Sequence, residues 1–106
     1  MPQTEVIDLL KRYIFLLNAS GIPVKKAFLY GSYSRNEAHE NSDFDIMIVS
    51  KIFDNADELI KAKAWRLTEQ IDLRIEPYTV GLQKFLTDEV SPLLQVIKQK
   101  GTEIKL

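Results

Sequence analysis

Hydrophobic and polar residues repeat along this chain with two different periods, which divides it into helical and extended segments. Residues 5–18 place apolar side chains three or four positions apart on one face, as in an amphipathic helix. Thr4 is the expected N-cap of this helix, and Gly21, which precedes an Ile-Pro pair, is its expected end. Three further helices are predicted over residues 55–69, 81–88 and 92–100.

Short apolar runs between these helices predict the strands. Residues 25–30 and 43–49 have the length and composition of strands, and residues 102–106 could add a last short one. Residues 71–77 alternate strictly between apolar and charged side chains and end at a proline, which predicts a strand with Ile71, Leu73 and Ile75 facing the core. This mixture of helices and strands predicts an α/β fold.

Composition narrows the class of protein. The 106 residues are enough for one small domain, spanning 1–106, and contents of 45% apolar and 27% charged residues are typical of a globular protein. A net charge of −1 gives no general basic field for nucleic-acid binding. The absence of cysteine excludes disulfides and thiolate metal sites. With no apolar run of membrane-spanning length and no signal-peptide pattern, we expect a cytoplasmic protein with no membrane contact.

Two short polar motifs carry the candidate chemistry. Gly31-Ser32 ends the first predicted strand, and Asp43 and Asp45 open the second after a ten-residue spacer. The two-residue period of a strand places both aspartates on one face, where their charges repel. Mg²⁺ removes this conflict because it prefers oxygen ligands and often combines one or two carboxylates with substrate phosphates. A glycine turn lets backbone N–H groups approach phosphate oxygens, so the two motifs together indicate nucleotide chemistry.

These motifs resemble the signature of the DNA polymerase beta nucleotidyltransferase superfamily, in particular its minimal nucleotidyltransferase branch. The family pattern is G-S-x-A-R-G-x-A-x(3)-S-D-x-D, and the chain matches it at Gly31-Ser32, Arg35, Ala38 and Ser42-Asp43-Phe44-Asp45. It departs from the pattern at Ser34, where alanine is usual, and at Asn36, where glycine is usual. Asparagine tolerates positive φ better than most residues, so a left-handed turn is retained. The resemblance implies a polymerase beta palm-like fold, with a small mixed β-sheet backed by helices.

The resemblance also implies a reaction and a set of site residues. The reaction is transfer of a nucleoside monophosphate, in the simplest case AMP from ATP, to a hydroxyl acceptor. Asp43 and Asp45 would hold Mg²⁺ or Mn²⁺, and Asp72 on the following strand would be the third catalytic and metal-binding carboxylate. Glu76 lies on the same predicted strand face and stays open as the alternative. In nucleotide binding, Gly31 and Ser32 would hold the β- and γ-phosphates, while Arg35 would stabilise the loop or face the triphosphate.

Minimal nucleotidyltransferases commonly pair with a helical HEPN protein, as the antitoxin of a ribonuclease toxin. The resemblance therefore implies ATP or another nucleoside triphosphate as donor, a HEPN-type partner as acceptor, and a homo- or hetero-oligomer. The alternative is a nucleotide-binding protein of low activity that neutralises a toxin by forming a complex. The discriminating observation is whether Asp72 lies beside Asp43 and Asp45: a third carboxylate there would favour the enzyme, whereas one facing bulk solvent would favour the binding protein.

Overall fold

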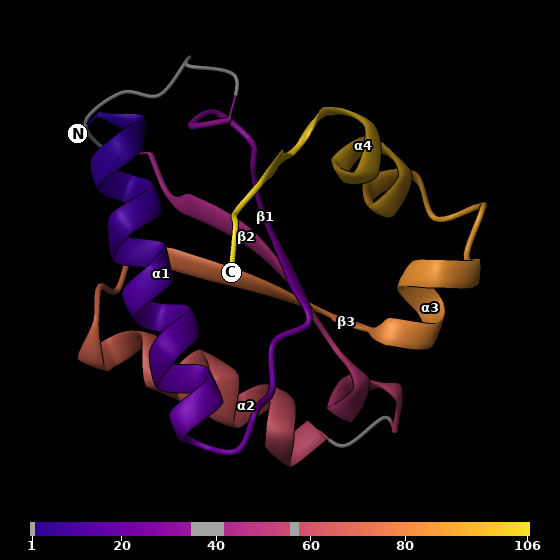
Figure 1. Cartoon of the computed structure of the whole chain (residues 1–106), viewed down its shortest axis with the longest axis horizontal. Helices are drawn as coiled ribbons and strands as arrows, with labels where there is room; N and C mark the ends of the chain where they lie inside the picture. The colour runs from indigo at the N-terminus through magenta and orange to yellow at the C-terminus, as the bar shows by residue number, and fades with distance from the viewer. Residues whose placement is uncertain (1, 35–41, 56–57) are drawn as a thin grey trace.

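The computed structural model describes residues 2–34, 42–55 and 58–106, and Figure 1 shows how their helices and strands are arranged. The helices are α1 (Gln3–Ala19), α2 (Glu58–Leu67), α3 (Leu82–Thr87) and α4 (Pro92–Lys100), with short 3₁₀ helices η1 (Lys51–Asp54) and η2 (Thr68–Gln70). The strands are β1 (Lys26–Tyr30), β2 (Phe44–Ser50), β3 (Ile75–Gly81) and β4 (Thr102–Glu103). Within the described ranges, no helix is long and apolar enough to cross a membrane.

The strands form one mixed sheet in the order β3-β2-β1-β4. Strand β1 is antiparallel to both β2 and β4, whereas β2 and β3 are parallel. Parallel neighbours require a crossover connection, which η1, α2 and η2 provide. The prediction of an α/β fold with a small mixed sheet is confirmed.

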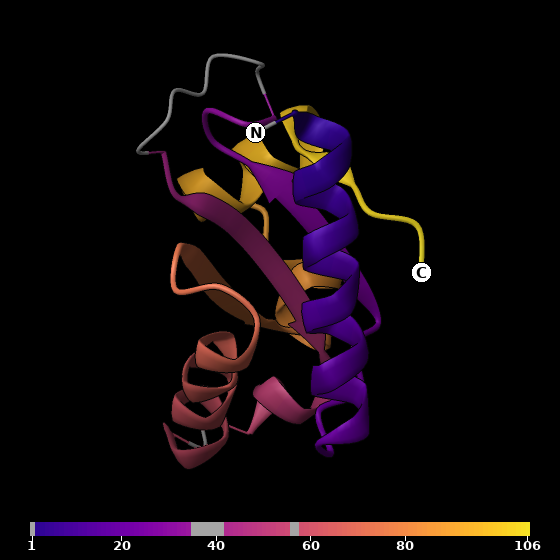
Figure 2. The same ribbon diagram turned by 90° about the vertical axis from the view of Figure 1, so that its left-hand side faces the viewer.

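Helices cover both faces of this sheet. Helices α1 and α2 lie on one face, and α3 and α4 lie on the other, to the right in Figure 1 and behind the sheet in Figure 2. Each face of the sheet has its own hydrophobic core, and alternate side chains of β2 pack into the two. Phe44, Ile46 and Ile48 lie on the α1 side, and Met47 and Val49 lie on the α4 side. Because both faces are covered, most of β2 is buried, as is usual for the central strand of an α/β sheet.

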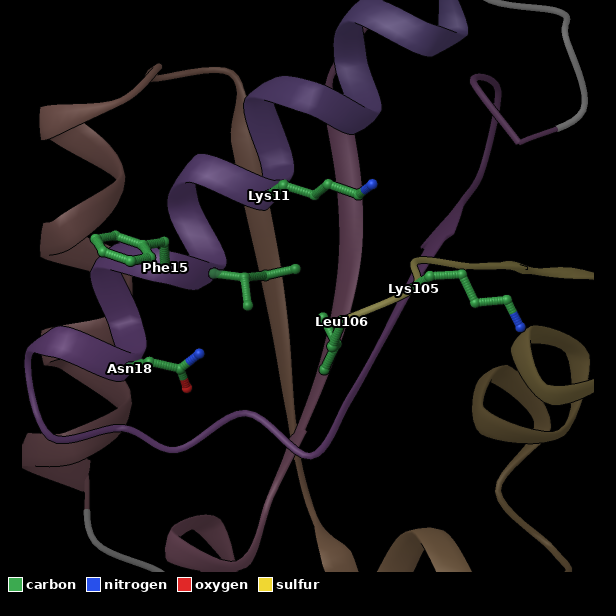
Figure 3. Close-up of a pocket in the computed structure, with 6 residues that line it drawn as sticks. Lys11, Phe15, Asn18, Lys105 and Leu106 are labelled. Carbon is green, nitrogen blue, oxygen red and sulfur yellow. The ribbon is translucent and has the colours of Figure 1, made fainter.

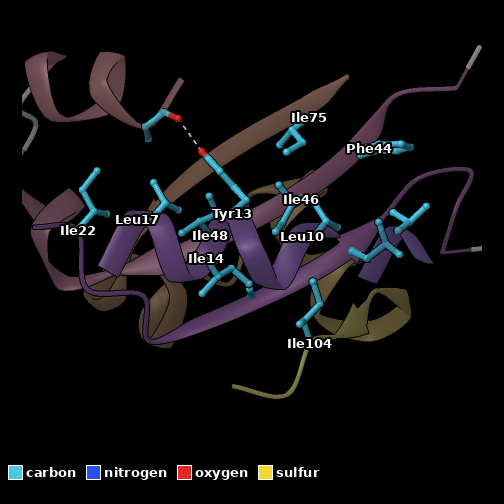
Figure 4. Packing of buried hydrophobic residues seen from close by; sticks show 14 of the residues in the cluster. Leu10, Tyr13, Ile14, Leu17, Ile22, Phe44, Ile46, Ile48, Ile75 and Ile104 are labelled. Atoms are coloured by element: carbon cyan, nitrogen blue, oxygen red, sulfur yellow. Dashed lines mark hydrogen bonds between the residues drawn. The ribbon is translucent and has the colours of Figure 1, made fainter. Parts of the chain in front are cut away.

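A buried hydrogen bond joins the two helices on the first face. The Tyr13 hydroxyl of α1 donates to the carbonyl oxygen of Ala64 in α2 at 2.6 Å, as the dashed line in Figure 4 shows. Tyr13 is fully buried, so this bond satisfies its only polar group inside the apolar core. Helix α2 is thereby held against α1 by a specific contact as well as by apolar packing.

The prediction of a strand over residues 71–77 is wrong for its first four residues, because β3 begins at Ile75. Backbone N–H groups upstream of Ile75 bind within a turn, where Asp72 N donates to Thr68 O at 2.8 Å and Arg74 N donates to Asp72 Oδ1 at 2.8 Å. Leu73 is 77% exposed and does not face the core. The alternating pattern therefore comes from a side-chain-stabilised turn followed by a strand.

The predicted N-cap of the first helix is also wrong. Helix α1 begins at Gln3, and Pro2 occupies the capping position without a side-chain hydrogen bond. Proline has the fixed φ that suits the start of a helix, so the helix starts earlier than Thr4. At its other end, the predicted stop is confirmed by Gly21, whose φ of 89° is left-handed.

Candidate active site

The turn after β1 is built around Gly31. Its φ is 76°, in the left-handed region that favours glycine. A Cβ atom at this position would overlap Oδ2 of Asp45 on the neighbouring strand. Glycine is therefore required twice, once by the backbone conformation and once by the close approach of an aspartate carboxylate.

Hydrogen bonds hold the residues after Gly31 from two sides. The hydroxyls of Ser34 and Thr102 are 3.0 Å apart, which ties the turn to β4. Gln3 Nε2 of α1 donates to Tyr33 O at 2.7 Å, and the buried Tyr33 ring meets Phe44 edge-on with centroids 5.1 Å apart. Tyr33 is thus a packing residue. Ser32 lies within this anchored turn, whereas Arg35 and Ala38 fall outside the described residues.

Three acidic residues lie together where β2 and β3 begin. Asp45 and Glu76 are directly paired on the two parallel strands, and the exposed Asp43 stands two residues before Asp45. The Glu76 carboxyl is close enough to both aspartates to interact with their charges. Partial burial raises the pKa of Glu76 above its ordinary value, and the negative charges of Asp43 and Asp45 raise it further. Because Glu76 keeps much of its surface in solvent, water limits both effects.

Tyr30 extends the same row across the sheet, because it pairs with Asp45 on the β1 side. Burial raises the pKa of Tyr30 to about 12, and the charges of Asp45 and Glu76 add to this effect. The phenol therefore stays protonated at neutral pH and borders the carboxylates as a neutral group. The sequence reasoning missed Tyr30, and its position just before Gly31 was the only signal.

The structure places Asp72 away from this group. Its carboxylate accepts two bonds from the Arg74 guanidinium, from Nη2 at 2.8 Å and from Nε at 3.1 Å. These bonds lower the pKa of Asp72. Arg74 in turn lies over the Phe44 ring, 4.5 Å from its centroid. Since Phe44 and Asp45 point to opposite faces of β2, the Asp72–Arg74 pair and the carboxylate row lie on opposite sides of the sheet.

The comparisons with known proteins agree with this geometry. Residues 10–101 match the profile of a nucleotidyltransferase domain. The chain belongs to the nucleotidyltransferase domain family. No curated protein matches the chain by sequence.

Two solved structures share the fold of this nucleotidyltransferase domain. One is a protein of Sulfolobus solfataricus described as a nucleotidyltransferase, with 19% identity, a TM-score of 0.60, and coverage of 77% of this chain and 72% of that one. The other belongs to the toxin–antitoxin pair MntA–HpeT, in a variant with two aspartates changed to glutamate. It has 21% identity, a TM-score of 0.57, and coverage of 99% of this chain and 73% of that one.

The donor set of the domain fits a hard divalent cation. Asp43, Asp45 and Glu76 supply only carboxylate oxygens, which are the ligands that Mg²⁺ and Mn²⁺ prefer. Among the described residues, no group of three or more acidic, histidine or cysteine side chains is placed so that together they could hold a metal ion. Mg²⁺ does not need such a group, because it usually takes one or two protein carboxylates together with substrate phosphates. The residues present therefore fit an ion that binds with its nucleotide.

A pocket of about 290 Å³ adjoins the Gly31 turn on the α4 side, and we call it the α4 pocket. It is lined by Tyr30, Gly31, Ser34, Leu93, Val96, Ile97, Lys100 and Gly101. A second pocket of about 230 Å³ lies between α1 and the C-terminal residues, where Figure 3 shows Lys11, Phe15 and Leu106 around it. Helix α1 covers the opposite face of the sheet from Asp45, whereas the α4 pocket is lined by Tyr30 and Gly31, the neighbours of Asp45.

Proposed function

We propose that this nucleotidyltransferase domain transfers AMP from ATP to a hydroxyl group of a protein, with Mg²⁺ or Mn²⁺ as the required cofactor. The observation that carries the proposal is the row formed by Asp45 and Glu76, with Asp43 beside it and the Gly31 backbone against Asp45. A carboxylate cluster next to a glycine turn combines a cation site with a phosphate site. The family membership supports the transfer of a nucleotide.

Each residue of the cluster has a distinct role in this proposal. Asp43 and Asp45 hold the divalent ion, which would neutralise phosphate charge and orient the reacting oxygens. Glu76 takes the place of the third carboxylate that the sequence pattern suggested for Asp72. The backbone of Gly31 and Ser32 would hold the β- and γ-phosphates, and we assign Arg35 to the triphosphate from its place in the sequence motif.

The transfer is a single in-line displacement. The acceptor hydroxyl oxygen attacks the α-phosphorus of ATP, and the bond from this phosphorus to the bridging oxygen of pyrophosphate breaks. Pyrophosphate leaves with the electron pair of that bond, and Glu76 accepts the proton of the hydroxyl.

We further propose that the acceptor is a HEPN-type helical toxin and that the domain acts in the cytoplasm as its antitoxin. A structural neighbour from a toxin–antitoxin pair supports this choice of partner. The alternative is neutralisation by complex formation alone, without turnover. The position of Glu76 beside Asp45 favours catalysis, because simple binding does not require a third carboxylate at that point.

Transfer can be tested with ATP labelled at either the α- or the γ-phosphate, Mg²⁺ and the purified protein encoded beside this gene. We expect the α-label to join the partner protein and the γ-label to leave as pyrophosphate. The Asp45→Asn variant is the negative control, and we expect it to transfer neither label. Transfer of the γ-label would show a kinase, and a partner neutralised without any label would show a binding protein.

A further inference from the structure

The α4 pocket has a mostly apolar wall. Leu93 and Val96 are 47% and 53% exposed on α4, and the buried Ile97 lies deeper on the same helix. The Tyr30 ring forms another part of the lining and connects the pocket to the row of Asp45 and Glu76. Such a wall suits a flat, weakly polar group attached to something bound at the Gly31 turn.

Two of the uncharged polar groups in the lining, the Ser34 hydroxyl and the Gly101 N–H, already have partners within the protein. The Ser34 hydroxyl is 3.0 Å from the Thr102 hydroxyl and 3.5 Å from the Lys100 carbonyl. The Gly101 N–H donates to the Ile97 carbonyl at 2.8 Å. Among the lining side chains, this leaves the Tyr30 hydroxyl and the Lys100 ammonium group to meet the edge of a bound base.

From this geometry we infer that the α4 pocket holds the base and ribose of the nucleoside triphosphate by apolar contact, and that it accepts ATP and GTP about equally while disfavouring pyrimidines. The inference rests on the proposed function and specifies its donor substrate. All bases present a flat apolar face, so contact of this kind tolerates different bases. A purine offers a larger face than a pyrimidine and buries more apolar surface.

The size and charge of the pocket favour a nucleoside over a segment of a partner protein. Its volume of about 290 Å³ is just below the range of about 300–1,000 Å³ for small-molecule sites, which suits a small ligand. Lys100 is the charged residue of the lining, and its ammonium group complements a phosphate. Gly31 belongs both to the pocket and to the phosphate turn, so a ligand bound at one site reaches the other.

Displacement of a fluorescent ATP analogue in the presence of Mg²⁺ tests the selectivity. We expect ATP and GTP to compete with affinities within about tenfold of each other, and CTP to compete more weakly. A site that reads a base by hydrogen bonds can reject the wrong ligand by about 10⁴–10⁵-fold, whereas apolar pockets discriminate far less. A preference of more than about 100-fold for one purine would therefore overturn the inference.

A matched pair of double variants tests the location. Leu93→Gln/Val96→Gln changes the pocket wall, while Leu86→Gln/Val90→Gln changes one leucine and one valine that are exposed outside it. We expect the first double variant to bind ATP and GTP about tenfold more weakly, which equals about 1.4 kcal/mol of binding free energy, and to bind inorganic tripolyphosphate as the wild type does. We expect the second double variant to bind the nucleotides and tripolyphosphate with wild-type affinity.

The outcomes separate the pocket from the proposed function. If the wild-type protein transfers the α-label but Leu93→Gln/Val96→Gln binds ATP normally, the pocket assignment is wrong and the proposed function stands. Equal weakening by both double variants would also overturn the assignment. If the wild-type protein binds neither ATP nor tripolyphosphate with Mg²⁺, both proposals fall.

Discussion

Asp45 and Glu76 lie directly opposite each other on the parallel strands β2 and β3. Like charges at paired positions of a sheet are destabilising, and Asp43 adds a third carboxylate within reach of Glu76. One pleat further along the same face, Met47 and Tyr78 pack into the apolar cluster, so the acidic residues are confined to one end of the sheet. This confinement is expected of a site that binds a cation and is not needed for folding.

The contact between Gly31 and Asp45 predicts a loss of both stability and activity in Gly31→Ala. A left-handed alanine costs about 1–2 kcal/mol, and its Cβ would also displace the Asp45 carboxylate. We expect a lower urea midpoint and a large loss of label transfer.

Gly21 provides the control for this substitution. Its φ of 89° is also left-handed, but a Cβ there would meet no atom within 4 Å. Gly21→Ala should therefore lose similar stability and keep its transfer rate. Equal losses of activity in the two variants would show that strain, and not the position of Asp45, causes the defect.

The Asp72–Arg74 pair predicts a pH-dependent contribution to stability. Because hydrogen bonds from Arg74 lower the pKa of Asp72 in the folded chain, the contribution is fully present above the unfolded pKa and is lost as pH falls through the folded pKa. Asp72→Asn should thus reduce the free energy of unfolding at pH 7 by less than about 1 kcal/mol, because the pair is partly exposed.

Urea midpoints of the wild-type protein and Asp72→Asn at neutral and strongly acidic pH measure this effect. We expect the difference between the two proteins to shrink at acidic pH. Asparagine keeps one oxygen for the Arg74 backbone N–H but loses the acceptor of the Arg74 Nη2 bond, so the variant removes the charge together with that bond. A difference that does not change with pH would mean that the charge of Asp72 contributes nothing.

The Tyr13–Ala64 hydrogen bond predicts a purely structural phenotype. Tyr13→Phe removes the donor and leaves the Ala64 carbonyl without it, which should lower the free energy of unfolding by about 1–2 kcal/mol. Because Tyr13 packs on the face opposite the carboxylates, label transfer at a temperature where the variant is folded should be unchanged. A variant with wild-type stability would contradict the importance of this bond.

Local patterns were sufficient to predict most of the fold. The helical period identified α1 and α4, and apolar runs identified β1 and β2, because each of these elements buries one continuous stripe or run. The predicted start of β3 was wrong because the turn closed by the Asp72 side chain shows the same alternation of apolar and charged residues as a strand. Period alone does not distinguish the two.

The candidate site could be predicted only in part, for a related reason. Asp43 and Asp45 lie within one local motif, so their grouping followed from the two-residue period. The choice between Asp72 and Glu76 depends on where β3 starts and on its register with β2, and both are set by contacts between distant segments. Tyr30 beside Asp45 and the α4 pocket depend on such contacts as well.

The central claim is that Glu76, and not Asp72, is the third carboxylate of the site. It is tested most directly by the rate of α-label transfer from Mg²⁺–ATP in Glu76→Gln and Asp72→Asn, two substitutions that each replace one carboxylate by its amide. We expect Glu76→Gln to lower the rate by about 10²–10⁴-fold, the loss typical of a general base, and Asp72→Asn to stay within a few-fold of the wild type. Loss of transfer in Asp72→Asn with a wild-type rate in Glu76→Gln would contradict the claim.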